Sequence, residues 1–326
     1  MPGLIQQKVN PKDWLFGSSP IQNDTVFIKS GDWGEWLPEG ELQKTNVFDT
    51  WSCVSQSACN VIETYLNYML AQGGISAVKT EWLKEKGYLV DGKFNFSDRY
   101  VARISNTKVG YGNTYNSVGE AIRVHGLVPE SMWSTSMDMN ESEYYSDVSE
   151  VTQATGRDFI DKFPINYELV HLEDFKEALQ YAPLQIGVNA WYKNNQGVYY
   201  NTVDKHNHAV EDYKEHHIFD SYKPYLKTLV EDYNYGFWAG KYYVNLNKYM
   251  KKLELKQNTL VQLTEGHGGF GLYLDDRIIV DDLAKIQASW ILRNSKEGKF
   301  NEGFTRSLTQ EQWDSFPKAN LKGETL

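Results

Sequence analysis

The stretch Asp49–Met69, DTWSCVSQSACNVIETYLNYM, decides how the rest of the chain is interpreted. At 100° per residue its apolar side chains from Val54 to Met69 share one face, which predicts an amphipathic helix over Cys53–Leu70. The polar residues just before Cys53 are typical of a helix start. Both cysteines of the chain lie in this stretch, so it also decides what their thiols can do.

The two cysteines, Cys53 and Cys59, stand on different sides of the expected helix. Six residues correspond to a net rotation of about 240° and a rise of about 9 Å, which excludes a disulfide between them. No other residues are spaced to complete a zinc site with them. Cys59 lies in the helix body and is expected to be a core thiol. Cys53 lies at the helix start, where free N–H groups and the dipole favour a thiolate, so it is either structural or a nucleophile.

The composition restricts the possible functions. The chain has 326 residues, 41% hydrophobic and 23% charged, as expected for a folded protein of one large domain with an appendage or of two domains. Its net charge of −10, without Lys/Arg blocks, argues against nucleic-acid binding. The sequence shows neither a signal-peptide pattern nor an apolar run long enough to span a membrane. We expect a cytoplasmic or virion-associated protein without cofactor or metal.

The sequence pattern changes twice along the chain. Helical periodicity dominates the first half, and strand-like runs from APLQIGVNA to KYYVNL follow, which predicts an α+β fold of two lobes. The later runs TLVQL, FGLYLDD and RIIVDD predict a small β-rich module. We therefore expect an irregular N-terminal arm, a main domain made of a helical lobe and a β lobe, and a C-terminal module, over residues 1–42, 43–252 (lobes about 43–130 and 131–252) and 253–326.

Four of the seven histidines cluster in one segment, DKHNHAVEDYKEHHIFDSY. It contains two short strand patterns that should pair as a hairpin, with His208 opening the first strand and Asp220 on the second. A carboxylate oxygen of Asp220 can then reach the imidazole Nδ1 of His208. His206 and His208 alternate on one strand face and could bind a metal, but the sequence offers no third ligand at a convincing spacing. His206, His216 and His217 are interpreted as surface residues.

Taken in order, these segments resemble the papain-like cysteine peptidases. The family motifs S-C-W, N-H-A-V and N-S-W are similar to SCV at Cys53, NHAV at His208 and DSY at Asp220. The segments FSDRYV, VGYGNT and HGLVPESMW match further family patterns in the same order, so the resemblance spans about Gln43 to Val244. It implies a papain-like two-lobe fold, in which a helical lobe packs against an antiparallel β lobe. The chain looks most like divergent microbial or phage-encoded members.

The resemblance implies a role for each matched catalytic position. Cys53 would be the nucleophile and His208 the base, and Asp220 would orient the imidazole where the family has Asn. The family's oxyanion-hole Gln lies six residues before the nucleophile, where this chain has Val47. The oxyanion donor is therefore expected at Gln43 or at Asn46.

Further expectations concern the substrate side of the site. Gly110 and Gly112 would lie on the edge that binds substrate backbone, and Tyr222 would replace the family's Trp as a smaller shield of the base. The long inhibitory segment of the family has no evident counterpart, because only about forty irregular residues precede the match.

Three functions are compatible with these residues. The first is a papain-like endopeptidase that forms a thioester, the second a related Cys-His hydrolase acting on peptidoglycan peptides. The third is a catalytically idle papain-fold protein, for example a virion component. The implied partners are a peptide or protein substrate and, through the C-terminal module, a virion or host protein.

Overall fold

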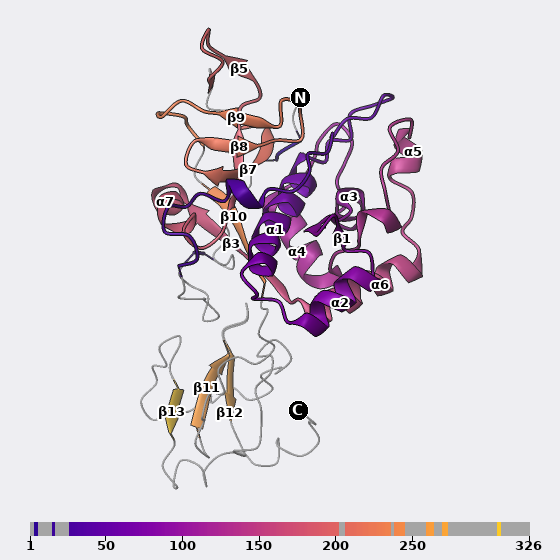
Figure 1. The fold of residues 1–326 in the computed structure, drawn as a ribbon, viewed down its shortest axis with the longest axis vertical. Coiled ribbons are helices and arrows are strands. Elements are labelled where there is room, and N and C mark those ends of the chain that lie inside the picture. Colours follow the sequence, from indigo (N-terminus) through magenta and orange to yellow (C-terminus); the bar gives the residue numbers. More distant parts are fainter. Residues whose placement is uncertain are drawn as a thin grey trace. The chain divides into compact units, whose positions relative to one another are not determined.

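A computed structural model describes most of the first 244 residues and the backbone of three later strands. The described residues are 3–5, 15–16, 26–201, 206–235, 238–244, 259–263, 269–272 and 305–307. The chain forms two compact units, the first made of Met1–Gly17 and Asn23–Leu246 and the second of Ser18–Gln22 and Asn247–Leu326. In the first unit helices gather on one side of a long helix, α1, and a sheet lies on its other side (Figure 1).

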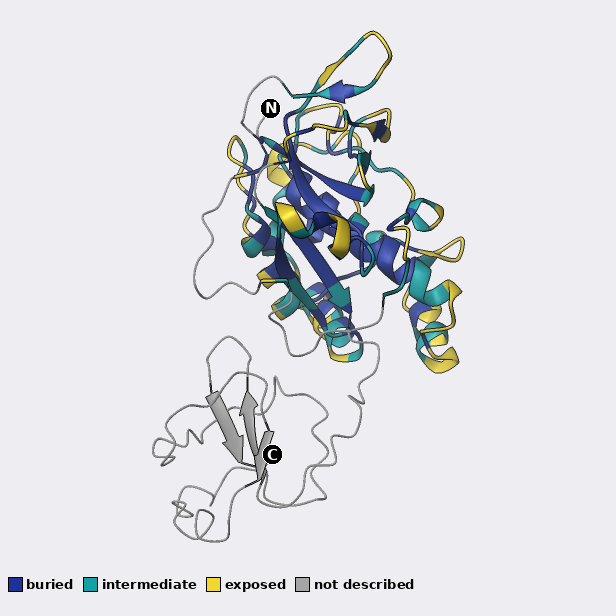
Figure 2. Ribbon diagram, turned by 90° about the vertical axis from the view of Figure 1, so that its left-hand side faces the viewer, coloured by how far each residue is buried: buried dark blue, intermediate teal, exposed yellow. Residues whose placement is uncertain are grey.

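Helix α1, Cys53–Ala71, is the buried centre of the first unit, in agreement with the helix expected from the sequence. It packs against α3 (Asp98–Ile104) and α4 (Tyr115–His125) on one side and against strands β7 (His208–Lys214) and β10 (Trp238–Val244) on the other. Its small polar residues let the sheet approach closely: Gln185 Nε2 donates to the Val54 carbonyl at 2.6 Å and to Ser57 Oγ at 2.8 Å. Figure 2 shows the buried residues gathered in the middle of this unit and the exposed ones on outer loops and helix faces.

The helical lobe consists of short helices that mostly begin at Ser, Thr or Asn caps, whose side chains accept backbone N–H groups. Its elements are η1 Gly34–Trp36, α2 Ala77–Glu85, β1 Leu89–Val90, β2 Lys93–Phe94, α3 Asp98–Ile104, α4 Tyr115–His125, η2 Glu130–Met132, α5 Glu141–Tyr144 and α6 Glu150–Lys162. The sequence interpretation ended this lobe near residue 130 and named neither α5 nor α6. Helix α6 extends it because its buried side, at Gly156 and Phe159, packs on α4.

The sheet lobe is a six-stranded antiparallel sheet with the order β3-β10-β4-β7-β8-β9. Its strands are β3 Ile165–His171, β4 Leu184–Val188, β7 His208–Lys214, β8 His217–Phe219, β9 Leu226–Thr228 and β10 Trp238–Val244, with a separate hairpin of β5 Tyr192–Lys193 and β6 Tyr199–Tyr200. The expected pairing of the two histidine-containing strands is confirmed, since β7 pairs with β8. The expected helix at 172–181 is shorter, with η3 Leu172–Asp174 followed by α7 Phe175–Ala178.

The second unit contains a three-stranded antiparallel sheet with the order β12-β11-β13. Its strands are β11 Thr259–Leu263, β12 Gly269–Leu272 and β13 Thr305–Ser307. The first two fall on the expected runs TLVQL and FGLYLDD, whereas RIIVDD lies outside the described residues. The module boundary at 253 and the virion or host partner of the module stay predictions. In the described part of the chain, every helix is too short or too polar to cross a bilayer.

An aromatic cluster fills the core of the helical lobe. The ring of Phe159 lies 4.8 Å from that of Tyr88, 5.2 Å from that of Phe96 and 5.0 Å from that of Phe163. Such pairs add to the stabilisation from apolar burial, so Phe159 should be the residue on which α6 depends.

Phe159→Ala should destabilise the protein by about 3–5 kcal/mol, because it removes a buried ring and leaves a cavity. The measurement is denaturant-induced unfolding of the full chain. Val151→Ala on the same helix is the matched control, since Val151 is 71% exposed and its truncation should change the free energy of unfolding by less than about 0.5 kcal/mol. Equal effects of the two substitutions would contradict this account of the core.

Candidate active site

The two cysteines are both free and have different surroundings, as the helix geometry predicted. Cys59 is 2% exposed in the body of α1, and burial raises the pKa of its thiol well above the usual value, so it stays a protonated core thiol. Cys53 is the first residue of α1, with its side chain at the positive end of the helix dipole. It is also fully buried, which the sequence did not indicate.

His208 and Asp220 meet as expected, but through the other ring nitrogen. His208 opens β7 and Asp220 follows β8, and His208 Nε2 lies 2.6 Å from Asp220 Oδ1. The expectation that the carboxylate would contact Nδ1 is therefore wrong. The ring is turned so that Nε2 faces Asp220, which leaves Nδ1 for the hydrogen bond between His208 and the Cys53 side chain. Thiol, imidazole and carboxylate thus form one continuous chain.

The charged form of His208 is strongly favoured. Burial by itself lowers the pKa of His208, but the charge and hydrogen bond of Asp220, together with the hydrogen bond to Cys53, outweigh burial and raise the pKa to about 10. The imidazolium therefore persists at neutral pH. Its stabilising effect on the fold is complete below a pH of about 6.5, the ordinary pKa of His, and is lost as the pH rises through about 10.

Lys227 completes this arrangement and was not identified from the sequence. From the middle of β9 its Nζ lies 2.5 Å from Asp220 Oδ2 and 2.6 Å from the carbonyl oxygens of Tyr222 and Pro224. Both side chains of the Asp220–Lys227 ion pair are buried. Burial raises the pKa of Asp220, but His208 first and Lys227 second lower it below its usual value, so the carboxylate stays charged. Lys227 is the buried middle residue of a strand only three residues long, and this alternation was the only sign in the sequence that its side chain points inward.

Two aromatic rings cover the imidazole. Tyr222 lies where the sequence placed it, with its ring 5.4 Å from that of His208, and its hydroxyl donates to Asp49. Trp191, which the sequence interpretation did not name, stands nearly perpendicular to the His208 ring at 5.6 Å. Lys227 Nζ lies 5.0 Å from the Trp191 ring centre. The two rings keep water from the His208–Asp220 bond and so strengthen it.

Of the two candidate oxyanion donors, the structure brings only Gln43 to the site. The Gln43 backbone N–H donates to the Ser221 carbonyl, and its side-chain Nε2 donates to Asp49 Oδ1 at 2.8 Å. Asn46 is exposed and its amide donates to Asp138 instead.

The segment Gly3–Ile5 crosses the site and covers Cys53. Gly3 N–H and Leu4 N–H both donate to the Asn207 carbonyl on one side. On the other side the Asn113 N–H donates to the Gly3 carbonyl, and the Ile5 N–H donates to the Asn113 carbonyl. A Cβ on Gly3 would lie 2.6 Å from Cys53 Sγ, so only glycine fits here. The arm that the sequence left irregular therefore occupies the space above the thiol.

The two glycines expected to bind substrate backbone behave differently. Both have positive φ angles, 81° at Gly110 and 79° at Gly112. A Cβ on Gly112 would lie 1.9 Å from the Gly3 carbonyl oxygen, so this position is kept open for a passing peptide. Around Gly110 the space is empty, and Gly110 belongs to the turn closed by the bridge of Lys108 with Gly112.

Neither a protein-family model nor a curated protein sequence matches the chain. Solved structures similar to it are papain-like cysteine proteases. Xylellain, a cysteine protease from Xylella fastidiosa, is 14% identical with a TM-score of 0.48, over 74% of this chain and 95% of that chain. Digestive procathepsin L 3 of the Tenebrio molitor larval midgut is 15% identical with a TM-score of 0.43, over 70% and 73%. The proform of the ragweed pollen allergen Amb a 11, a cysteine protease, is 14% identical with a TM-score of 0.42, over 68% and 67%. These are likenesses of fold alone.

Asp220→Asn should lower the pKa of His208 by about 1–3 units, because it removes the nearest negative charge. Lys227→Met should shift the pKa upward, since Asp220 then acts without a counter-charge. The titration of the labelled His208 ring can be followed by NMR. Because an unpaired buried Asp220 can prevent folding, the double variant Asp220→Asn/Lys227→Met is the control, and its His208 pKa should lie between those of Asp220→Asn and wild type, since the two substitutions act on the imidazole with opposite signs. Shifts of the same sign in both single variants would refute this account of the charges.

Removal of residues 1–5 should raise the rate of Cys53 alkylation by iodoacetamide about tenfold or more. Four backbone hydrogen bonds hold Gly3–Ile5 in place, and a tenfold change corresponds to about 1.4 kcal/mol, within what a few such bonds contribute. Leu4→Ala should raise the rate in the same direction, because Leu4 is buried against Gly187, whereas Ile5→Ala at an exposed position should not. The label is located by mass spectrometry, and unchanged Cys53 labelling after removal of the segment would show that it is no barrier.

Proposed function

We propose that the chain is a cysteine peptidase that hydrolyses peptide bonds through a thioester intermediate. The observation that carries the proposal is the hydrogen-bonded chain of Cys53, His208 and Asp220 at the start of a buried helix. A thiol at the positive end of a helix beside an imidazolium is the environment in which cysteines become nucleophiles. Asp220, fixed by Lys227, holds the ring of His208 in one orientation.

In the proposed reaction the Cys53 thiolate attacks the carbonyl carbon of a peptide bond and forms a tetrahedral intermediate. The imidazolium of His208 then gives its Nδ1 proton to the leaving amine nitrogen as the C–N bond breaks, which leaves a thioester on Cys53. Water attacks the thioester with neutral His208 as the base, the acid product leaves, and the thiolate–imidazolium pair is restored. Asp220 stays charged throughout and stabilises the imidazolium.

The Cys53 backbone N–H and the Gln43 side-chain amide are the proposed oxyanion donors. One Gln43 N–H donates to Asp49, and the second is assigned to the developing oxyanion. A donor of this kind contributes about 3–4 kcal/mol to transition-state stabilisation in comparable sites. Gln43 is held by both its backbone and side chain, so it is fixed before substrate binds.

The covering segment supports a peptide as the substrate class. Gly3–Ile5 shows that an extended backbone fits between the Asn113 and Asn207 backbones with its hydrogen bonds satisfied on both sides. We propose that a substrate replaces this segment and uses the same backbone groups, with Gly112 leaving room and Tyr222 closing the wall beside His208. Gly110 has no such part, because it lies in the neighbouring turn.

A second candidate is a papain-fold protein without turnover, which the complete burial of Cys53 favours. The two differ in the reactivity of the thiol. An active pair reacts rapidly with alkylating agents near neutral pH as soon as the segment leaves, and this reactivity depends on His208.

Cys53→Ser should reduce cleavage of a mixed peptide library by at least about a thousandfold, because the substitution removes the nucleophile and keeps its size. Cleavage is followed by mass spectrometry, with the full chain and with the variant lacking residues 1–5. His208→Ala should abolish both cleavage and rapid alkylation of Cys53, whereas His217→Ala, at a half-buried histidine on β8 whose Nδ1 hydrogen-bonds to the Glu215 carbonyl, should change neither. Cleavage that persists in Cys53→Ser would contradict the assignment of Cys53 as the nucleophile. If Cys53 is alkylated as slowly in wild type as in His208→Ala, the catalytically idle protein is favoured.

A further inference from the structure

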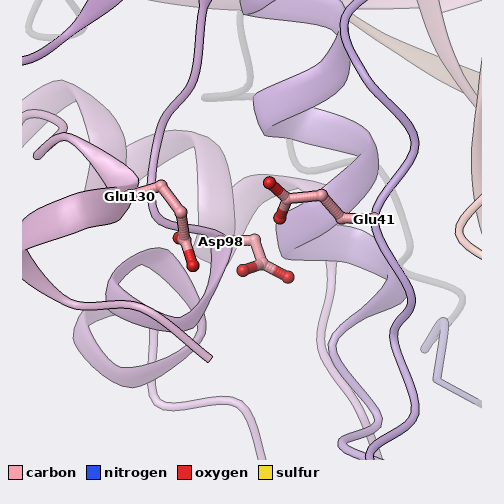
Figure 3. A group of neighbouring side chains, drawn as sticks. All are labelled: Glu41, Asp98 and Glu130. Atoms are coloured by element: carbon pink, nitrogen blue, oxygen red, sulfur yellow. The ribbon is translucent and has the colours of Figure 1, made fainter. Parts of the chain in front are cut away.

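A group of carboxylates lies in the helical lobe, apart from the Cys53–His208–Asp220 chain. Glu41, Asp98 and Glu130 each offer a carboxylate oxygen, and these oxygens lie within 4.8 Å of one another. Figure 3 shows the three side chains converging from separate segments. Asp98 opens α3, Glu130 opens η2, and Glu41 comes from the segment that precedes Gln43.

The buried amide oxygen of Gln56 indicates what kind of ligand this group binds. Gln56 on α1 is only 4% exposed and hydrogen-bonds to Asp98, while its Oε1 has no hydrogen-bond partner. Gln56 lines the same small cavity as Glu41, Asp98 and Glu63, with a volume of about 10 Å³. A buried acceptor without a donor is costly, and this cavity has room for about one water-sized body. The cavity is thus lined by oxygen acceptors, and a hydrogen-bond donor or a cation is required to satisfy them.

Positive side chains do not meet this need within the described part of the chain. None of its ion pairs involves Glu41, Asp98 or Glu130. Arg99 follows Asp98 in the sequence, but its guanidinium donates to the carbonyls of Tyr144 and Ser134. Burial and the neighbouring carboxylates raise the pKa of Glu41 to about 8 and that of Glu130 to about 10. Either protons or a cation must therefore compensate the group.

We infer that Glu41, Asp98, Glu130 and the Gln56 amide oxygen bind one divalent cation of the oxygen-preferring class, with calcium as the best fit. Carboxylates and an amide carbonyl are the ligands calcium uses. The Cys59 thiol also lines the cavity, but burial raises its pKa well above the usual value, so it is not a thiolate ligand of the kind that would select zinc. Magnesium keeps several of its own waters in strict octahedral geometry, which so small a cavity does not accommodate. The inference departs from the metal-free protein expected from the sequence and is independent of the proposed peptidase activity.

The test is thermal unfolding of the full chain, first stripped with a chelator and then supplied with calcium chloride or magnesium chloride. Calcium should raise the unfolding temperature by about 3–8 °C at a hundredfold excess over its dissociation constant, and magnesium should have a much smaller effect. Equilibrium dialysis should find one tightly bound calcium per chain. A protein that neither binds calcium nor gains stability from it has a proton-sharing carboxylate group only, and the inference is then wrong.

Glu41→Gln separates the cation site from a merely structural cluster. Without calcium, at mildly alkaline pH, the variant should unfold at the same or a higher temperature than wild type, because one repelling charge is gone. With calcium its stabilisation should be lost, and the bound calcium should disappear. Glu35→Gln, an exposed position on η1, is the matched control and should keep the full calcium effect.

Asp98→Asn is the second variant, and it tests the same site if Glu41→Gln does not fold. It should also lose the bound calcium in equilibrium dialysis. Calcium binding of wild-type strength in both variants would place the ion elsewhere on the chain and overturn the assignment.

Discussion

Everything in the first unit depends on the burial of α1 between the helical lobe and the sheet. A helix buried on both sides needs residues that let two lobes approach it, and the small side chains around Ser57 do this, so that Gln185 can hydrogen-bond to the helix backbone. Because α1 cannot shift against either lobe without breaking these contacts, its first residue is fixed in space. Cys53 is that residue, and the sheet brings His208 to it.

The same burial creates two electrostatic problems, which the chain solves differently. In the sheet lobe Asp220 is paired on both sides, by the His208 imidazolium and by Lys227, so its buried carboxylate is compensated through two short hydrogen bonds. The Asp220–Lys227 pair has no net charge, as an asparagine would have none. The carboxylate is nevertheless the group next to the imidazole, so it still stabilises the positive charge of His208. In the helical lobe Glu41 and Asp98 line one cavity with Glu130 close to them, no cation from the described residues is paired with them, and the pKa values of Glu41 and Glu130 rise instead. The charge of Asp220 is balanced by neighbouring side chains, whereas the carboxylate group in the helical lobe can be balanced by a bound cation.

The sequence predicted those features whose signal is local. The periodicity of α1 located Cys53 and Cys59 on different sides, and the short hairpin brought Asp220 to His208. It did not predict Lys227, because three residues of β9 carry too little periodicity to mark an inward side chain. Nor did it predict the approach of Gly3 to Cys53, which joins residues 50 positions apart, or the ring nitrogen used by His208, which depends on how the side chain packs. Long-range contacts of single residues leave no pattern in one sequence.

The segment from Glu41 to Gln43 connects the two electrostatic centres. Glu41 belongs to the carboxylate group beside α3, and Gln43 hydrogen-bonds to Ser221 next to Asp220. Two residues span at most about 7 Å, so the position of one side chain restricts the other. Any charge that draws Glu41 toward Asp98 therefore also fixes the backbone from which the Gln43 amide reaches the site. A short piece of chain outside any helix or strand can thus couple the helical lobe to the sheet lobe without passing through α1.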